Sequence, residues 1–372
     1  MPISRRDFLT TSAAAAVIPA LGRHGELFAA VPRVPRPVTE GLIRVDKNEN
    51  PMGPFATARS AIIGAMSEAN RYPGSAASKL GDAIASMHGV KSEQVVLGCG
   101  SGEILKICTE QFTTATRGLV QASPTFEACG SVATLLGHPV VAVPVTESMH
   151  LDLDAMAASA RGGGLVYLCN PNNPTSTVHG ASAVKGFIAR VRRDSPETYI
   201  LVDEAYHEYV EEPSYATMIP ETHDSHVIVS RTFSKVFGMA GVRVGYAIAA
   251  SETASRLNNV TLDSNVNQFA AAGALAALAD TAAIRAEQQR NRDVRAFTIR
   301  WFNDHKFTVA KCDANFLFVD IKRDVSPVIA ACLDKNVAVG RPFPPLTTHL
   351  RVSIGKQAEM EQALSVLGKV LA

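Results

Sequence analysis

The residue of this chain best suited to covalent chemistry is Lys235, in the segment RTFSKVFGMAGVRVGY at residues 231 to 246. Its neighbours are mostly small, aromatic or apolar, and such residue types favour burial. Burial disfavours the charged ammonium group, lowers its pKa and leaves a nucleophilic amine. A glycine-spaced stretch then leads to a second cation, Arg243. The segment therefore predicts a desolvated, reactive lysine followed by an arginine.

A carboxylate closes the apolar run in YILVDEAYHEY, residues 199 to 209. Asp203 stands at the end of the run, and Tyr206 follows three residues later. A carboxylate that ends a buried strand is costly unless a cationic or protonated group pairs with it. We therefore expect Asp203 to have such a partner.

An anion site is predicted by QVVLGCGSGEILKI, residues 94 to 107, in which an apolar run, a glycine turn and a helical pattern follow one another. Glycines allow backbone amides to approach a phosphate at a helix N-terminus, where unpaired N–H groups and the helix dipole favour an anion. The string also resembles the first motif of S-adenosylmethionine methyltransferases. That alternative needs an acidic residue at the end of the next strand, and RGLVQASP supplies none. A structural turn without a ligand stays open.

Asparagines follow another apolar run in LCNPNNPTS, residues 168 to 176. At the C-terminal end of a strand they can hydrogen-bond a ligand in the crevice of an open α/β sheet, although alone they are ordinary turn composition. Together these motifs match the needs of pyridoxal phosphate. They supply an acid for its ring nitrogen, an Asn and a Tyr for its ring oxygen, an anion site for its phosphate and a desolvated lysine.

The elements that must position these residues alternate along the chain. Helical patterns such as FATARSAIIGAMSEAN alternate with short apolar runs, which predicts an α/β sheet flanked by helices. The runs are QVVLG, RGLVQA, PVVAVPV, GLVYLC, TYILVD, HVIVSR and VGYAIA. A long helical region from about 266 to 303 leads to short strands at FTVAK, NFLFVD and LRVSIG, which suggests a second, smaller α+β domain.

Composition favours small molecules as partners. The chain has 372 residues, 47% of them hydrophobic, so it can bury a large core. Its 36 Lys and Arg nearly balance 35 Asp and Glu, and this balance does not call for nucleic acid. The six cysteines show no C-x-x-C pair or metal-ligand spacing, so no metal site is expected.

The N-terminus has the organisation of an export signal. SRRDFLTTSAAAAVIPALG places Arg5 and Arg6 before an apolar stretch too short for a stable membrane span. It resembles the twin-arginine signal, with Thr10 where a lysine is usual. A tail with a chance arginine pair is the alternative. We expect a signal at residues 1–30, an arm at 31–54 that begins with the proline-spaced VPRVPRPV, a large cofactor-binding domain at 55–262 and a small domain at 263–372.

The sequence resembles the fold type I pyridoxal-phosphate aminotransferases of class I/II, and among them the histidinol-phosphate aminotransferase-like group. The resemblance runs from DKNENPMGP at residue 46 to LRVSIG at 350. It implies a three-layer αβα large domain with a mostly parallel sheet and a smaller α+β C-terminal domain. It also implies that Lys235 binds the cofactor as a Schiff base and moves the proton, and that Asp203 holds the ring nitrogen. The other residues it implies at the cofactor are Asn173 and Tyr206 at the ring oxygen, Phe126 on the ring face, and Ser101, Gly102, Thr232, Ser234 and Arg243 at the phosphate.

The resemblance extends to the substrate and to the partner subunit. Arg351 of LRVSIG resembles the arginine that grips the substrate carboxylate, which suits a planar guanidinium. Arg341 of GRPFPP is either a second anion clamp or a solvated loop charge. In this family the tyrosine of RYPG, here Tyr72, reaches the phosphate of the neighbouring subunit, which implies a homodimer with shared active sites.

Three positions depart from the family pattern. Ser176 stands where the family commonly has the glycine of N-P-T-G, so a turn that needs positive φ at this position is strained. Cys99 replaces a frequent asparagine, and Cys129 stands where many relatives have an aromatic residue. The short link from Arg341 to Arg351 helps to form the substrate pocket, so the identity of the substrate stays open.

We therefore expect a pyridoxal-phosphate-dependent transaminase that moves an amino group from an L-amino acid, or from histidinol phosphate, to a 2-oxo acid. A decarboxylase or racemase of the same fold would use the same lysine and aspartate. A non-catalytic cofactor-binding module and a methyltransferase are the alternatives from other classes. The signal predicts a periplasmic enzyme exported in folded form, and a cytoplasmic one if the signal interpretation is wrong.

Overall fold

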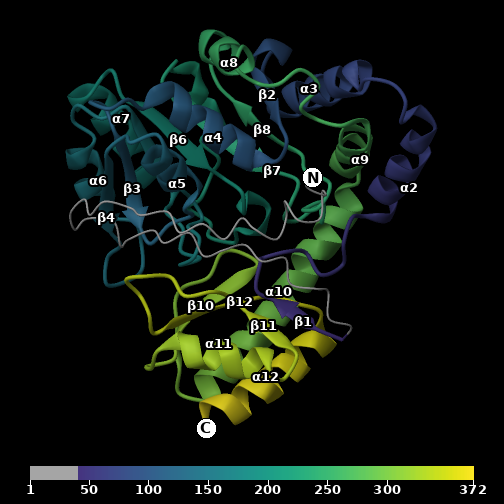
Figure 1. Cartoon of the computed structure of the whole chain (residues 1–372), viewed down its shortest axis with the longest axis vertical. Coiled ribbons are helices and arrows are strands. Elements are labelled where there is room, and N and C mark those ends of the chain that lie inside the picture. Colours follow the sequence, from purple (N-terminus) through teal and green to yellow (C-terminus); the bar gives the residue numbers. More distant parts are fainter. Residues whose placement is uncertain (1–40) are drawn as a thin grey trace, which may run out of the picture. The chain divides into compact units, whose positions relative to one another are not determined.

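The computed structural model describes residues 41–372, whose larger part is built on a seven-stranded sheet in the order β2-β8-β7-β6-β5-β3-β4 (Figure 1). Strands β3 to β7 pair in parallel, whereas β8 is antiparallel to both of its neighbours. The strands are β2 (Val95–Gly98), β3 (Leu119–Ser123), β4 (Val140–Pro144), β5 (Leu165–Cys169), β6 (Tyr199–Asp203), β7 (Val227–Thr232) and β8 (Gly245–Ile248).

Helices cover both faces of this sheet because alternate strand residues point to opposite sides. Leu165 and Tyr167 pack on one face, and Val166 and Leu168 pack on the other. The first face is covered by α4 (Ser101–Phe112), α5 (Ala128–Leu135) and α8 (Ser251–Asn258). The second is covered by α2 (Ala56–Gly64), α3 (Gly74–His88), α6 (Leu153–Ser159), α7 (Ala181–Asp194) and α9 (Gln268–Ala279). The predicted three-layer αβα architecture with a mostly parallel sheet is confirmed.

A second core lies in the smaller part of the chain. Strands β9 (Thr308–Val309), β10 (Phe316–Asp320) and β12 (His349–Ser353) form an antiparallel sheet, and β1 (Ile43–Val45) pairs in parallel with β11 (Val337–Val339). Helices α11 (Val325–Leu333) and α12 (Gln357–Leu371) pack beside them. The long helix α10 (Thr281–Asp304) runs between the two parts (Figure 1): Ile284 packs on the first core, and Val294 and Phe302 lie in the second.

Ten predicted strands coincide with observed ones, and the differences have local causes. The sequence did not predict β1 and β11, which are three residues each and too short for a periodic signal. The helical region predicted from 266 to 303 is two helices, because Asp280 ends α9 and its side chain accepts a hydrogen bond of 3.0 Å from the Ala283 amide, which caps α10.

The domain boundaries stay a prediction. Helix α9 lies beyond the predicted boundary at 262 and 263 but joins the core of the large sheet, and β1 of the predicted arm pairs with a strand of the smaller part. The predicted signal at 1–30 lies outside the described residues.

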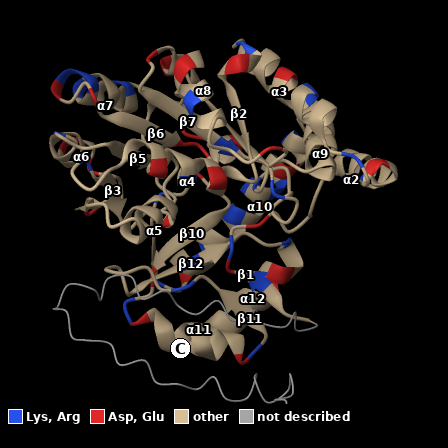
Figure 2. Cartoon of the chain, turned by 45° about the horizontal axis from the view of Figure 1, so that its top comes forward, with Lys and Arg blue, Asp and Glu red and all other residues tan. Residues whose placement is uncertain are grey.

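Charged residues of both signs are interspersed on outer helices such as α3 and α8 (Figure 2). Between residues 41 and 372, no single helix is long and apolar enough to cross a membrane.

Candidate active site

Lys235 lies in the loop that follows β7, and its side chain is partly buried. Its Nζ donates a hydrogen bond of 3.1 Å to the Asn48 carbonyl oxygen and lies 5.2 Å from the centre of the Tyr206 ring. Burial, reinforced by the nearby Arg351 cation, lowers the pKa of Lys235 from its ordinary value to about 8. About a tenth of this amine is therefore uncharged and nucleophilic at pH 7, far more than for an ordinary lysine.

Asp203 ends β6 and is 2% exposed. Its carboxylate accepts hydrogen bonds from the Tyr167 hydroxyl at 2.8 Å and the Ser230 hydroxyl at 3.1 Å. Burial raises the pKa of Asp203, while these two donors and the Lys235 cation act in the opposite direction. A buried carboxylate with two neutral donors is suited to hold a protonated ring nitrogen.

The N-terminus of α4 and Arg243 form an anion cradle. Helix α4 begins at Ser101, and its N-cap Gly100 has φ +76° and supplies no side-chain cap, while the Glu103 amide donates to the Gly100 carbonyl oxygen at 3.2 Å. The amides of Ser101 and Gly102 are therefore left for another acceptor. A Cβ at Gly100 would lie 2.3 Å from Nη2 of Arg243. A Cβ at Gly245 of β8 would lie 2.4 Å from the Ser101 nitrogen. Glycine at both positions therefore allows the arginine and the helix N-terminus to come together.

Two hydroxyls belong to the loop that carries Lys235. Thr232 and Ser234 are both buried, and the Thr232 hydroxyl donates to the Ser234 hydroxyl at 2.9 Å. The Ser234 amide in turn donates to the Thr232 oxygen at 3.1 Å. The two hydroxyls come from the end of β7 and the residue before the lysine, as the motif predicted.

Arg351 of β12 is 8% exposed and contacts the asparagine turn. Its Nη1 donates to Asn173 Oδ1 at 2.7 Å, and its Nη2 donates to the Asp46 carbonyl oxygen at 2.5 Å. Its Nε is buried and has no hydrogen-bond partner in the described part of the chain. Burial lowers the pKa of Arg351 to about 10. A buried guanidinium with an unsatisfied N–H is ready to receive an anionic ligand.

Three predicted residues make no contact with Lys235 or Asp203 in the described part of the chain. Phe126, which follows β3, is partly buried beside α5. Arg341 forms an ion pair of 2.6 Å with Glu127 at the surface and lies 4.1 Å from the centre of the Phe343 ring. Tyr72 is 92% exposed and makes no hydrogen bond with the described residues. The fold thus brings Lys235 to Tyr206, and Arg351 to Asn173, but it leaves Tyr72 on the surface.

Comparisons with known proteins agree with this geometry. The family model described as "Aminotransferase class I and II" matches residues 40–367. A histidinol-phosphate aminotransferase of Moorella thermoacetica is 36% identical over 89% of this chain and 86% of its own length. One of Symbiobacterium thermophilum is 34% identical over 89% of this chain and 91% of its own. The crystal structure of histidinol-phosphate aminotransferase from Sinorhizobium meliloti in complex with pyridoxal-5'-phosphate has a TM-score of 0.82 and 25% identity, with 88% of this chain and 90% of that chain covered.

The chain belongs to the class I and II aminotransferases. It is a pyridoxal-phosphate-dependent transaminase that acts on an amino donor and a 2-oxo acid. This membership decides against the methyltransferase alternative that the glycine turn raised. The residues present fit the cofactor, because the α4 N-terminus without a side-chain cap and the glycine-lined approach of Arg243 can receive a phosphate.

Sequence reasoning missed two residues of the aminotransferase site. Asn48 accepts a hydrogen bond from Lys235, and Tyr167 donates one to Asp203. Asn48 lies in DKNENPMGP, which marked the start of the resemblance, but that motif carried no assigned role. Tyr167 looked like one more apolar strand residue, and only the parallel pairing of β5 with β6 places it beside the acid.

The departures from the family pattern have clear structural settings. Ser176 has φ +63° and is fully buried, so the predicted positive φ is confirmed, and its hydroxyl donates to Cys312 Sγ at 3.1 Å. Cys99 is exposed beside the anion cradle, and its amide donates to Glu103 at 2.6 Å. Cys129 belongs to α5 and is buried in the core.

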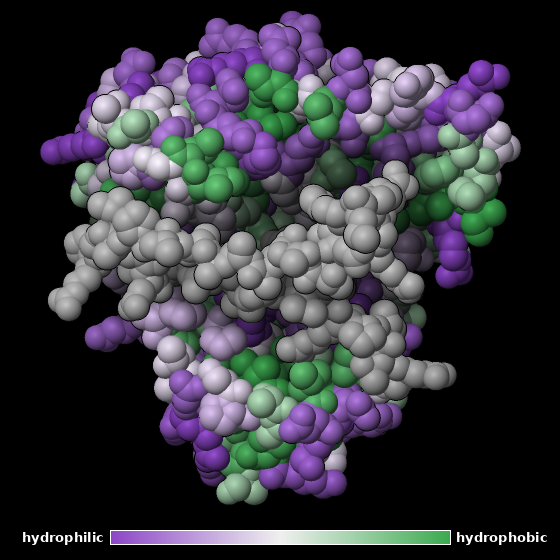
Figure 3. Space-filling view, viewed as in Figure 1, coloured by the Kyte–Doolittle hydropathy of each residue, from purple (hydrophilic) through white to green (hydrophobic). Residues whose placement is uncertain are grey.

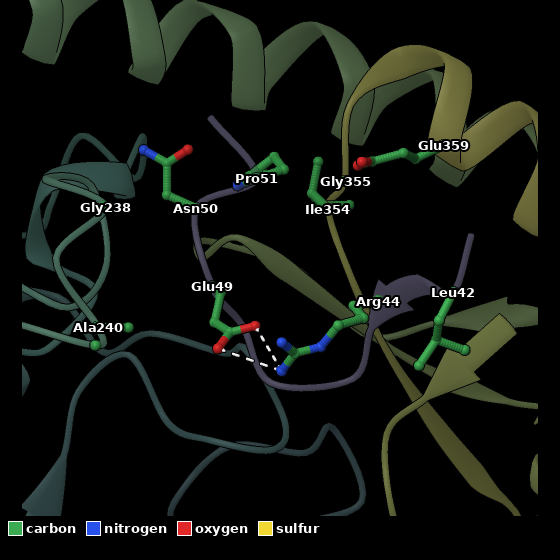
Figure 4. Close-up of a pocket in the computed structure, with 11 residues that line it drawn as sticks. Leu42, Arg44, Glu49, Asn50, Pro51, Gly238, Ala240, Ile354, Gly355 and Glu359 are labelled. Carbon is green, nitrogen blue, oxygen red and sulfur yellow. Dashed lines mark hydrogen bonds and ion pairs between the residues drawn. The ribbon is translucent and has the colours of Figure 1, made fainter. Parts of the chain in front are cut away.

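A pocket of about 360 Å³ lies next to the lysine loop of the aminotransferase. It is lined by β1 and the segments on either side of it, by the turn at Gly238 to Gly241, and by the start of α12 with the residues before it. Figure 4 shows Arg44 and Glu49 pointing toward one another in this pocket, where they form an ion pair of 3.1 Å. The pocket therefore borders the site on the side of the segment that holds Asn48.

Proposed function

We propose that transamination takes place at Lys235, whose amine is the point of covalent attachment for pyridoxal phosphate. The observation that carries this proposal is the lowered pKa of a lysine held against Asn48 and Tyr206. When bound, the cofactor supplies an electron sink that makes the α-proton of the donor acidic. The residues that would hold it are Asp203 at the ring nitrogen, Asn173 and Tyr206 at the ring oxygen, Phe126 on the ring face, and Ser101, Gly102, Thr232, Ser234 and Arg243 at the phosphate.

In this proposal Arg351 binds the substrate and Lys235 transfers the proton. Arg351 binds and orients the carboxylate of the donor through its planar guanidinium. The free Lys235 amine would take the α-proton of the donor as a general base and, in its protonated form, act as a general acid. Its pKa of about 8 suits both directions, because a base works best when its pKa lies near the working pH.

Borohydride reduction of freshly purified protein tests the attachment. We expect peptide mapping to find a pyridoxyl group on Lys235, and Lys235→Ala to abolish transamination. Lys47→Ala is the matched control, because Lys47 is an exposed lysine one residue from Asn48. We expect it to keep the label on Lys235. A label on another lysine, or normal turnover of Lys235→Ala, would refute the assignment.

We propose an L-amino acid as the amino donor, with histidinol phosphate as the second candidate. Support for an amino acid comes from Arg351, which offers one buried guanidinium, while Arg341 is paired with Glu127. Support for histidinol phosphate comes from the names of the relatives. A panel of L-amino donors, with histidinol phosphate included, read by the spectral change of the cofactor in the half-reaction, decides between them.

We propose a homodimer in which Tyr72 reaches the site of the other subunit. Large apolar side chains are exposed in α2, in the residues that flank it and in the turn before α9, which packs against α2, and hydrophobic residues show at the right edge of Figure 3, where α2 lies. They are Met52, Ile63, Met66, Val260 and Leu262, each at least 45% exposed. Mixing Tyr72→Ala with Lys235→Ala subunits should restore part of the activity, because each hybrid dimer then keeps one complete site. Light scattering that finds a monomer would remove this proposal.

We propose that the chain is exported to the periplasm by the twin-arginine route, on the basis of Arg5 and Arg6 and the apolar stretch after them. Export of a folded protein would let the cofactor bind before transport. Replacing both arginines with lysine should leave the enzyme in the cytoplasmic fraction. A wild-type protein found entirely in the cytoplasm would contradict the proposal.

A further inference from the structure

Asn48 is held in an unusual backbone conformation at the centre of the site. Its φ is +55°, and the residue is 1% exposed. Non-glycine residues rarely adopt this left-handed region, although asparagine tolerates it better than most. Such a conformation persists when its surroundings fix it, and it occurs often at functional sites.

Two residues of the smaller part of the chain fix Asn48. The backbone N–H of Asn48 donates to the Ser353 hydroxyl at 2.8 Å, and that hydroxyl donates to the side-chain Oδ1 of Asn48 at 2.9 Å. The side chain of Asn315, which is fully buried, donates to the Asn48 carbonyl oxygen at 3.1 Å. Asn315, directly before β10, and Ser353, at the end of β12, therefore set both the backbone and the side chain of Asn48.

The carbonyl oxygen and the side-chain Nδ2 of Asn48 contact two residues that are proposed to act on the cofactor. The carbonyl oxygen accepts the hydrogen bond from Lys235 Nζ at 3.1 Å. The side-chain Nδ2 donates to the Tyr206 hydroxyl oxygen at 3.1 Å. Because Tyr206 accepts this bond, its own hydrogen stays available for another acceptor.

We propose that Asn48 is a positioning residue that directs the Lys235 amine through its carbonyl oxygen and the Tyr206 hydroxyl through its side-chain amide. The inference rests on the proposed roles of Lys235 and Tyr206. Asn48 holds the released amine at a fixed place beside the Tyr206 ring while the substrate is bound. The same residue turns the Tyr206 hydrogen toward the ring oxygen of the cofactor. One residue thus sets the geometry of the proton-transfer group and of a group that tunes the cofactor.

Two substitutions change the side-chain contact to Tyr206, and both keep the carbonyl oxygen that accepts from Lys235. Asn48→Asp keeps the shape but replaces the donor by a carboxylate, which would take the Tyr206 hydrogen and add a negative charge. Asn48→Gly accepts the positive φ and keeps the carbonyl oxygen but removes the amide. Asn291→Asp is the matched control, because Asn291 is also 1% exposed and its amide donates to the Ala314 carbonyl oxygen rather than to Lys235 or Tyr206.

The readout is the pH midpoint of the absorbance change of the holoenzyme, which reports protonation of the Lys235 nitrogen. We expect Asn48→Asp to raise this midpoint by about one unit or more and Asn48→Gly to raise it by about half a unit, with no shift in Asn291→Asp. We expect kcat of Asn48→Asp to fall about 100-fold with KM changed less than about threefold.

Borohydride mapping keeps this inference separate from the proposed function. A pyridoxyl label on Lys235 of Asn48→Asp, together with an unchanged midpoint and kcat, would overturn the role of Asn48 and leave the role of Lys235 intact. No label on Lys235 of the wild-type enzyme would overturn both. If Asn48→Asp does not fold, the midpoint of Asn48→Gly gives the decision.

Discussion

Tyr167 and Asp203 form a buried pair on neighbouring parallel strands, in which the phenol donates a hydrogen bond of 2.8 Å to the carboxylate. Tyr167 is fully buried and Asp203 is 2% exposed, so water does not replace this bond when it is lost. The pair lies on the face of the sheet that α4 and α5 cover. The acid proposed to hold the ring nitrogen is therefore itself held by a second strand.

Replacing Tyr167 with phenylalanine should weaken the anionic form of Asp203. A hydrogen bond to a charged group contributes about 1.5–3 kcal/mol, so we expect kcat to fall by about 10- to 100-fold, with a smaller change in KM. Steady-state kinetics measure both. Tyr199→Phe is the control, because Tyr199 lies at the other end of β6 and stacks on Phe112. Equal losses in the two variants would mean that the effect is structural.

Adding a methyl group at Gly100 should expel the cofactor phosphate. The new Cβ would lie 2.3 Å from Arg243 Nη2, and the φ of +76° would also be strained. We expect Gly100→Ala to raise the Kd for pyridoxal phosphate by about 100-fold, which corresponds to about 2.7 kcal/mol. Fluorescence titration of the apoenzyme measures the Kd. Gly137→Ala is the control, because Gly137 has φ +72° and open space around its Cα, so it tests strain alone.

Two substitutions at Ser176 should differ in stability by the cost of its backbone conformation. Ser176→Gly and Ser176→Ala both lose the contact to Cys312, but only alanine keeps the penalty of φ +63°. We expect the glycine variant to be more stable than the alanine variant by about 1 kcal/mol. Chemical denaturation of the two holoenzymes measures this difference. Equal stabilities would mean that the turn relaxes when the serine is removed.

The sequence was enough to predict site residues that stand within one short motif. It was not enough to predict residues whose role depends on contact between two distant segments. Lys235, Asp203 and Arg351 each stood out within a short motif, and the apolar runs gave the strands of the large sheet. The short pair β1 and β11 is set by tertiary pairing, which a three-residue run does not encode. Asn48 is 187 residues from Lys235, so its carbonyl oxygen entered the site only when the chain was folded. Backbone acceptors of this kind leave no signal in residue types.

The pH dependence of cofactor capture follows from the lowered pKa of Lys235. Only the neutral amine attacks the aldehyde of pyridoxal phosphate, so the capture rate of the apoenzyme should rise with pH and level off above about 8. An unperturbed lysine would level off more than two units higher, near pH 10.4. Stopped-flow absorbance after mixing the apoenzyme with the cofactor measures the midpoint. Arg351→Gln removes a cation that lowers this pKa, so we expect its midpoint to move upward. Arg341→Gln serves as the control, because Arg341 is paired with Glu127 and is not among the charges that shift Lys235. A wild-type rate that still rises steeply between pH 9 and 10 would contradict the desolvated lysine on which the proposed chemistry depends.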